Sequence, residues 1–297
     1  MKKTTLLPTE AVNKRTEKLD KATPLQIARM INAEDFAAAR AVQKAAPAIA
    51  RAIDAAARTH LAGRNIVCIG AGTSGRLGIL EAVECMPTFG VKFTDVQGIL
   101  AGGKTAMFRS KEGAEDDAVQ GAKDILAKAH KGDFVIGLTA SGITPYVLGA
   151  LKAAKKLGCT TALLACNPQA DASHADIFIF LPTGAEALNG STRMKAGTAT
   201  KMALNAITTG AMARAGKVYG NLMVDVKPTN KKLVRRAVRL ICTISGADEK
   251  TAEKLLPAAG GNVKTACVMF AKKCTRAQAE KLLKKHKGFL REALLEK

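Results

Sequence analysis

Short apolar runs alternate with helical stretches through the middle of this 297-residue chain. Each run places apolar residues on consecutive positions, which is typical of strands that are buried on both faces of a sheet. The runs cover Ile66–Ile69, Val96–Leu100, Asp133–Thr139, Thr160–Ala165 and Ile177–Leu181. Because these strands alternate with helices, the pattern predicts an α/β fold, in which a five-stranded parallel sheet is flanked by helices and the crossovers are right-handed.

The two ends of the chain differ in pattern from this central part. Residues 1–22 are predicted to form an extended, charged arm. An alanine-rich helical stretch covers Ala37–Ala62, and Pro47 is expected to break or kink it. After residue 226, short helical stretches separated by glycine and proline predict a small helical module. The predicted helices cover Asn230–Ser245, Asp248–Leu255, Val263–Phe270 and Arg276–His286. We therefore expect an N-terminal arm and helical pair over 1–62, a central α/β domain over 63–226 and a basic helical module over 227–297.

Two turns rich in hydroxyl groups follow strands of the predicted sheet. Gly70–Gly75 (GAGTSG) joins the first strand to a helix, and Ser141–Thr144 follows the third strand. The carboxyl ends of parallel strands meet at one edge of a sheet, where ligands of such proteins bind. Backbone N–H groups at the start of a helix attract anions, and hydroxyl groups donate hydrogen bonds to phosphate oxygens. Both turns therefore predict a phosphate site at this edge.

The glycine spacing of the first turn is compatible with two kinds of ligand. The pattern G-x-G-x-x-G also occurs in dinucleotide-binding proteins, which need an acidic residue at the end of the second strand to hold a ribose. Here the second strand runs into Ala101–Lys104 (AGGK), which contains no acid. Thr73 and Ser74 at the tip of the turn suit a small phosphate ester, so we favour a sugar phosphate.

A third polar segment, Asn189–Thr198 (NGSTRMKAGT), opens a long predicted helix. In one interpretation, Ser191 and Thr192 cap this helix while Arg193 and Lys195 face an anion. In the other, the segment is a capped helix with two solvated cations. The spacing alone does not decide between the two.

Carboxylates are the candidates for acid–base chemistry, because the four histidines are scattered and form no metal-binding pair or catalytic triad. A helix is predicted over Glu115–Ala129, with the acidic first turn that the helix dipole favours. Most carboxylates near such predicted helix starts are expected to be solvated. Glu84 differs, because it lies among the apolar residues Val83, Met86 and Phe89. Partial burial would raise the pKa of Glu84 into the range that is useful for acid–base catalysis. The remaining candidates are Glu81, Glu112, Glu115, Asp116 and Asp117.

The formal net charge of +21 is concentrated near the C-terminus, where residues 227–297 contain 18 Lys and Arg against 6 Asp and Glu. Such a surface attracts polyanions, including nucleic acids. However, tryptophan is absent and aromatic residues make up only 4% of the chain, whereas binding of single strands depends on aromatic stacking. We therefore favour a solvated basic surface over a nucleic-acid interface.

Composition also bears on the compartment. The seven cysteines form no C-x-x-C pair, so reduced thiols are expected rather than a zinc site or a disulfide framework. No apolar run reaches the roughly 18 residues that a membrane span needs. The apolar stretch after Met1 is too short for the core of a signal peptide. These features predict a cytoplasmic protein.

Seven motifs, taken in order, resemble those of the N-acetylmuramic acid 6-phosphate etherases, a family of sugar isomerase (SIS) domain enzymes. They are IGAGTSGRLG (69–78), ECMPTFG (84–90), AGG (101–103), GAEDD (113–117), SGITPYV (141–147), GSTRMKAGT (190–198) and KVYGNLMVD (217–225). The resemblance extends from Thr9-Glu10 into the C-terminal helices. It implies a five-stranded SIS-type sheet and a homodimer. It also implies cleavage of the ether between D-lactate and C3 of N-acetylmuramic acid 6-phosphate, without metal or nicotinamide cofactor.

The resemblance also assigns roles to residues of this chain. Glu84 would protonate the departing lactate and then activate water, while Glu115 would remove the proton at C2 of the ring-opened aldehyde. The residues that would surround the substrate are Thr73, Ser74, Gly75, Ser141, Gly142, Thr144, Ser191 and Thr192.

This chain departs from the family pattern in a few places. Ile143 stands where the family usually has arginine, and Met86 replaces the first of two prolines. Two alternative functions use the same type of domain. An amino-sugar phosphate isomerase would abstract the same proton without expelling lactate. A sugar-phosphate-binding regulatory protein would resemble the glucokinase regulatory protein, which carries two such domains.

Overall fold

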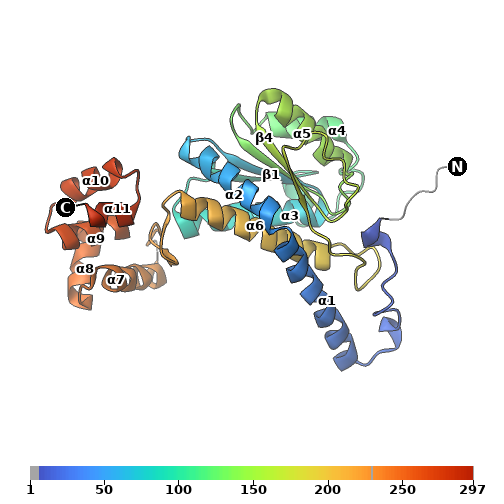
Figure 1. Ribbon diagram of the computed structural model, residues 1–297, viewed down its shortest axis with the longest axis horizontal. Coiled ribbons are helices and arrows are strands. Elements are labelled where there is room, and N and C mark those ends of the chain that lie inside the picture. The colour runs from blue at the N-terminus through green and yellow to red at the C-terminus, as the bar shows by residue number, and fades with distance from the viewer. Residues whose placement is uncertain (1–6, 229, 297) are drawn as a thin grey trace. The chain divides into compact units, whose positions relative to one another are not determined.

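The computed structural model describes residues 7–228 and 230–296 (Figure 1). The described chain forms two compact units. Unit 1 comprises the described residues up to Val83 together with Phe93–Thr209, and unit 2 comprises Glu84–Lys92 and the described residues from Gly210 onward. Within these ranges, no helix combines the length and the apolarity needed to cross a membrane.

Unit 1 contains a five-stranded parallel sheet in the order β2-β1-β3-β4-β5 (Figure 1), which confirms the predicted fold class. Its strands are β1 (Ile66–Gly70), β2 (Val96–Leu100), β3 (Phe134–Leu138), β4 (Thr160–Ala165) and β5 (Ile177–Phe180). Each strand lies within one residue of its predicted bounds. The chain leaves β1 for β2 on one side and returns to β3 on the other, so the strand order reverses between β1 and β3. Ligands of open parallel sheets bind at such a reversal.

Helices cover both faces of this sheet. Figure 1 shows α4 and α5 on one side, with α2 and α3 on the other. The helices that begin in unit 1 are α1 (Pro24–Lys44), α2 (Ala46–Leu61), α3 (Gly72–Phe89), α4 (Ala118–Leu126), α5 (Pro145–Leu157) and α6 (Lys195–Arg214). Alternate strand residues such as Val67 and Val135 pack with Val147 of α5. The break expected at Pro47 is present, because α1 ends before it and α2 carries this proline in its first turn.

The start of α4 differs from the prediction. The sequence pattern predicted a helix over Glu115–Ala129, but α4 begins at Ala118. The cause is Asp117, whose side chain accepts a hydrogen bond from Gln120 N (2.8 Å) and caps the helix. Glu115 therefore lies in the loop that precedes the helix instead of in its first turn.

Unit 2 is mainly helical. Besides the short antiparallel pair β6 (Val218–Tyr219) and β7 (Leu222–Met223), it contains α7 (Lys231–Ser245), α8 (Glu249–Ala258), α9 (Val263–Lys272), α10 (Arg276–Lys285) and α11 (Leu290–Leu295). The pattern of the sequence predicted the first four of these helices and missed α11. A buried apolar core, which includes Val238, Ile241 and Val268, holds the helices of this unit together.

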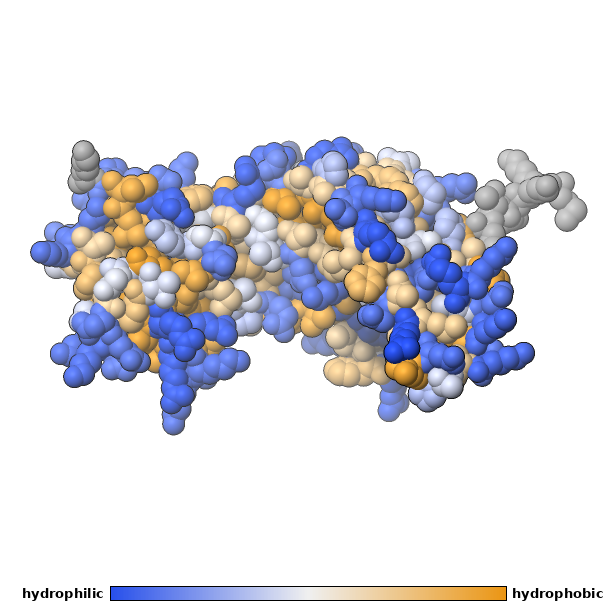
Figure 2. All heavy atoms as spheres, turned by 60° about the horizontal axis from the view of Figure 1, so that its bottom comes forward, coloured by the Kyte–Doolittle hydropathy of each residue, from blue (hydrophilic) through white to orange (hydrophobic). Residues whose placement is uncertain are grey.

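The basic residues of α7 face solvent. Lys231, Lys232, Arg235, Arg236 and Arg239 are all exposed, whereas Ala237, Val238, Leu240 and Ile241 are buried. Cations and apolar residues therefore occupy different faces of one helix, as expected for a solvated basic surface. Figure 2 shows hydrophilic side chains over much of the visible face of the molecule, with apolar patches between them.

Candidate functional site

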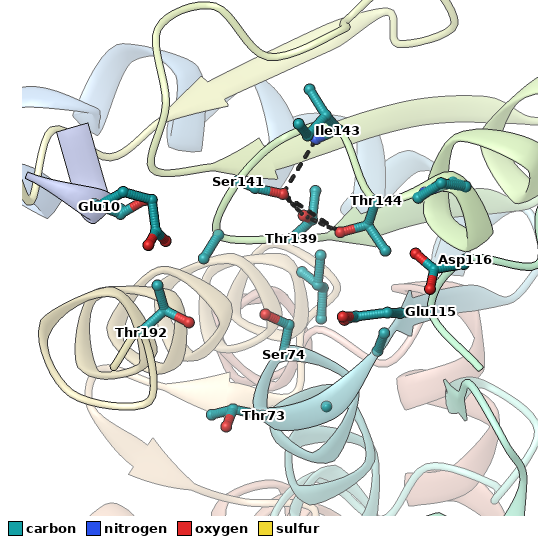
Figure 3. Close-up of a pocket in the computed structure, with 16 residues that line it drawn as sticks. Glu10, Thr73, Ser74, Glu115, Asp116, Thr139, Ser141, Ile143, Thr144 and Thr192 are labelled. Atoms are coloured by element: carbon teal, nitrogen blue, oxygen red, sulfur yellow. Dashed lines mark hydrogen bonds between the residues drawn. The ribbon is translucent and has the colours of Figure 1, made fainter. Parts of the chain in front are cut away.

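A cavity of about 540 Å³ lies in unit 1, where the chain leaves β1 and β3. Five segments supply its polar lining (Figure 3). These are the arm (Thr9, Glu10), the start of α3 (Thr73, Ser74), the loop before α4 (Glu115, Asp116), the segment from β3 to α5 (Thr139, Ser141, Thr144) and the residue Thr192 before α6. The cavity therefore lies at the reversal of strand order, where the topology predicts a ligand site.

Glycines bring the start of α3 directly onto the end of β1. A Cβ atom at Gly75 would lie 2.4 Å from the carbonyl oxygen of Gly70 and 2.6 Å from Leu100 Cδ1, so only glycine fits there. Gly72 adopts a positive φ of 52°, which glycine tolerates at no steric cost. This tight turn places Thr73 and Ser74 in the cavity lining, beside first-turn N–H groups that lack acceptors within the helix.

Three hydroxyl groups form a cluster after β3. Thr139 Oγ1 lies 2.7 Å from Thr144 Oγ1 and 3.2 Å from Ser141 Oγ, and Figure 3 shows these bonds as dashed lines. The turn between them is fixed by Gly142, whose φ is +79° and whose Cβ atom would lie 2.2 Å from Ala170 Cβ. Asn167 Nδ2 also donates to the carbonyl oxygen of Ser141 (3.0 Å). The hydroxyls are thus preorganised, because the surrounding backbone has little freedom.

Glu115 is held in place by its backbone. Its carbonyl oxygen accepts a hydrogen bond from Tyr146 N at the start of α5 (3.0 Å). Helices α4 and α5 approach closely, since a Cβ atom at Gly121 would lie 2.0 Å from the carbonyl oxygen of Tyr146. Tyr146 is buried and donates to Asp124 Oδ2 (2.5 Å); burial, followed by this bond, raises the pKa of its hydroxyl. In Figure 3 the Glu115 carboxylate points into the cavity, toward Ser74.

The charges that line the cavity are negative. Glu10, Glu115 and Asp116 contribute carboxylates, while none of the described lining residues is Lys, Arg or His. A smaller pocket of about 120 Å³ adjoins the cavity and contains Arg76 and Lys111. Arg76 is already engaged, because it donates to the carbonyl oxygens of Ala106 and Met107 (2.8 and 3.2 Å). Hydroxyl and N–H groups are therefore the donors that this cavity offers to an anion.

The structure brings many of the proposed site residues together. Thr73, Ser74, Glu115, Ser141, Thr144 and Thr192 all line the cavity. The lining does not include Gly75, Gly142 or Ser191, and the first two are buried in the backbone turns described above. Glu84 belongs to unit 2 and its side chain is exposed, so the partial burial expected from its apolar neighbours is wrong. Over residues 7–228 and 230–296, no three His, Cys, Asp or Glu side chains are grouped as a metal ion would require.

Several lining residues were missed by the sequence pattern. Thr139 ends the third predicted strand immediately before a hydroxyl-rich turn, and this position could have identified it as a site residue. The sequence around Asp116 did not point to the site, because Asp116 was expected in a solvated helical turn. Thr9 and Glu10 are about 60 residues from the first strand, so no local pattern places them beside it.

The structure corrects both interpretations of the segment before α6 at Lys195, although Arg193 is exposed, as the second one expected. The helix begins at Lys195 and is capped by the carboxylate of Glu186, which accepts from Lys195 N and Ala196 N (both 2.9 Å). Burial raises the pKa of Glu186, against the effect of these bonds. Lys195 is neither solvated nor free to bind a ligand, because its ammonium group is buried against Glu34 (2.5 Å).

Comparisons with known proteins identify the family. The profile of the glucokinase regulatory protein N-terminal SIS domain matches residues 48–155. An N-acetylmuramic acid 6-phosphate etherase from Clostridium botulinum (strain Langeland) is 46% identical over 292 residues, which cover 98% of this chain and 97% of that protein. The Erwinia tasmaniensis etherase is 49% identical over 97% of this chain and 95% of its own length. This chain belongs to the N-acetylmuramic acid 6-phosphate etherase family.

Membership of the etherase family makes the chain an enzyme, a carbon–oxygen lyase. Among solved structures, the chain is similar to a putative sugar-phosphate isomerase from Listeria monocytogenes. That structure is 20% identical, covers 65% of this chain and 92% of its own chain, and has a TM-score of 0.48. At this distance the likeness carries no argument about function.

Proposed function

We propose that this member of the etherase family cleaves N-acetylmuramic acid 6-phosphate to N-acetylglucosamine 6-phosphate and D-lactate in the cavity of unit 1. The observation that carries the proposal is the Glu115 carboxylate, which points into a cavity lined by a cluster of hydroxyl groups (Figure 3). A carboxylate base and hydroxyl donors for a phosphate are the two requirements of proton abstraction from a sugar phosphate.

The phosphate is expected to bind among the hydroxyls. Ser74, Ser141 and Thr144 line the cavity, and the first N–H groups of α3 lie beside Ser74. Hydroxyl and N–H groups at a helix start bind anions without a cation.

In the proposed reaction, Glu115 removes the proton at C2 of the ring-opened aldehyde. The adjacent carbonyl acidifies this proton, so a carboxylate is a sufficient base. The electron pair forms the C2–C3 double bond as the C3–O bond breaks, and the departing lactate oxygen takes a proton from a general acid. The family resemblance assigns this role to Glu84, whose exposed side chain does not line the cavity of this chain. The Glu84 carboxylate then takes a proton from water, whose oxygen adds to C3, and Glu115 returns its proton to C2. Both glutamates end in their starting states, and one water is consumed.

We also propose that the enzyme works in the cytoplasm as a homodimer. Two large apolar side chains of α1, Leu25 and Phe36, are 59% and 60% exposed. On α3, Leu80 and Val83 are exposed as well. Apolar surface of this kind is stabilised when a second copy covers it. Sedimentation velocity at micromolar concentration tests the proposal, and a single monomeric species would contradict it.

The purified protein is expected to convert N-acetylmuramic acid 6-phosphate into equal amounts of D-lactate and N-acetylglucosamine 6-phosphate. If the reaction is run in H₂¹⁸O, the label should enter C3 of the sugar and not the lactate, because the proposed cleavage breaks the C3–O bond. Enzymatic detection of lactate and mass spectrometry measure both outcomes. Binding without lactate release would favour the sugar-phosphate-binding regulatory protein. Ketose formation without lactate release would favour the amino-sugar phosphate isomerase.

Replacing Ile143 with arginine is expected to tighten the binding of N-acetylglucosamine 6-phosphate about tenfold. Ile143 lines the cavity, is 51% exposed, and donates its backbone N–H to Ser141 Oγ (3.3 Å). A guanidinium at this position would add charge-assisted hydrogen bonds to the phosphate. Isothermal titration calorimetry measures the change. Val119→Arg, at an exposed position of α4 outside the lining, is the matched control; equal tightening by both variants would contradict a local effect.

A further inference from the structure

The arm of the chain is a fixed wall of the cavity. Asn189 Nδ2 donates to the carbonyl oxygen of Glu10 (3.0 Å), and Thr16 Oγ1 donates to that of Ala187 (2.8 Å). These two bonds join segments that are more than 170 residues apart in the sequence. The arm therefore follows the 187–189 loop, and the positions of its side chains are determined by the fold.

A buried carboxylate connects this arm to the start of α6. Glu34 of α1 is 2% exposed and accepts hydrogen bonds from Asn13 Nδ2 (2.8 Å) and Arg15 Nη2 (3.0 Å) of the arm. The same carboxylate accepts from Lys195 Nζ (2.5 Å), the first residue of α6. One side chain thus fixes two walls of the cavity, the arm that carries Glu10 and the segment that carries Thr192.

Glu10 presents an unused acceptor to the cavity. Its carboxylate lines the cavity, and among the residues that the structure describes none forms a hydrogen bond or ion pair with it. In Figure 3 it lies on the opposite side of the cavity from Glu115, near Thr192. An ionised carboxylate accepts hydrogen bonds and donates none, so it binds O–H or N–H groups and repels anions.

Thr9, the residue before Glu10, also carries an unsatisfied polar group. Thr9 also lines the cavity and is 1% exposed, yet its Oγ1 has no hydrogen-bond partner within the described chain. A buried hydroxyl without a partner is costly, and such groups in native proteins call for an explanation. Within the described protein, the buried Thr9 hydroxyl is thus unsatisfied, and the exposed Glu10 carboxylate beside it has no partner.

We infer that Glu10 is a specificity-determining residue. Its carboxylate accepts a hydrogen bond from a hydroxyl or amide N–H on the side of the sugar phosphate that faces away from Glu115, and it keeps anionic groups off that side. The lactyl carboxylate of the substrate then has to face away from the arm. This inference rests on the proposed function, because it takes a sugar phosphate as the ligand.

Direct binding of N-acetylglucosamine 6-phosphate to the full chain tests the inference without turnover. Glu10→Ala is expected to raise the Kd about tenfold, and Glu10→Gln, which retains one acceptor oxygen but loses the charge, about threefold. Glu17→Gln is the matched control, since Glu17 is an exposed carboxylate of the same arm that does not line this cavity. Calorimetry measures the Kd, and thermal unfolding confirms that the variants keep the stability of the parent chain.

The outcomes separate the two proposals. If the parent chain binds the sugar phosphate and both Glu10 variants bind equally well, the inference about Glu10 is overturned while the proposed function stands. If the parent chain does not bind it, both fail. Weaker binding by the Glu10 variants, with unchanged binding by Glu17→Gln and unchanged unfolding temperatures, supports the inference.

Discussion

Glu115→Gln is expected to lower lactate release at least 1,000-fold, on the order of the largest effects of general acid–base groups. Glutamine keeps the size of the side chain and the backbone bond to Tyr146, but it cannot accept the C2 proton. In D₂O, the variant should also fail to exchange the C2 proton of N-acetylglucosamine 6-phosphate, which NMR measures directly. The Kd for this product should rise less than about threefold, because glutamine keeps the size of the side chain and removes a charge that would repel the phosphate.

A second variant distinguishes the role of Glu84 as the acid from that of Glu115 as the base. Glu84→Gln should lose lactate release but retain C2 exchange, since removal of the C2 proton does not require the acid that expels lactate. Glu112→Gln is the matched control for Glu115→Gln. Glu112 is an exposed carboxylate of the loop that carries Glu115, but it lines only the smaller pocket. If Glu115→Gln exchanged the C2 proton at the parent rate, its assignment as the base would be wrong.

The sheet was predictable because its signal is local. Each strand is a continuous apolar run, and burial on both faces needs no information from distant residues. The turns after β1 and β3 were predictable for the same reason. Their glycines and hydroxyls stand next to the strands that position them, and Ser74, Ser141 and Thr144 all line the cavity.

The rest of the site depends on contacts that are distant in sequence. Glu34 and Lys195 are 161 residues apart, so no pattern near Lys195 showed that its ammonium group is buried. The same holds for Glu10, which the 187–189 loop positions. The error at α4 has a local cause. The side chain of Asp117 accepts the backbone N–H of Gln120 and caps the helix, so the helix starts after Asp117 and Glu115 stays in the loop. Apolar neighbours in sequence did not bury Glu84, because two of them, Val83 and Met86, are themselves exposed on the same helix.

The buried ion pair should make folding strongly dependent on Glu34. The pKa of this carboxyl is lowered from 4.5 to about 2, first by its hydrogen bond with Arg15, against burial, and then by Lys195 and Asn13. Because the folded pKa lies below the unfolded one, the folded state holds fewer protons in this range. The stabilisation is therefore complete above about pH 4.5 and is lost as the pH falls toward 2.

Glu34→Gln is accordingly expected to lower the free energy of unfolding at pH 7 by about 3–5 kcal/mol, since it leaves the ammonium of Lys195 buried without a counter-charge. Arg15 adds little to this loss, because its side chain is 72% exposed and water can solvate it. Urea denaturation at pH 7 and pH 3 measures the effect, which should be smaller at pH 3. The double variant Glu34→Gln/Lys195→Met should be more stable than Glu34→Gln alone, because it no longer buries an unpaired ammonium group. Lys195→Met in the parent chain should lower the stability, because it leaves the Glu34 carboxylate without this partner. Equal unfolding free energies for Glu34→Gln and the control Glu17→Gln would show that the pair does not stabilise the fold.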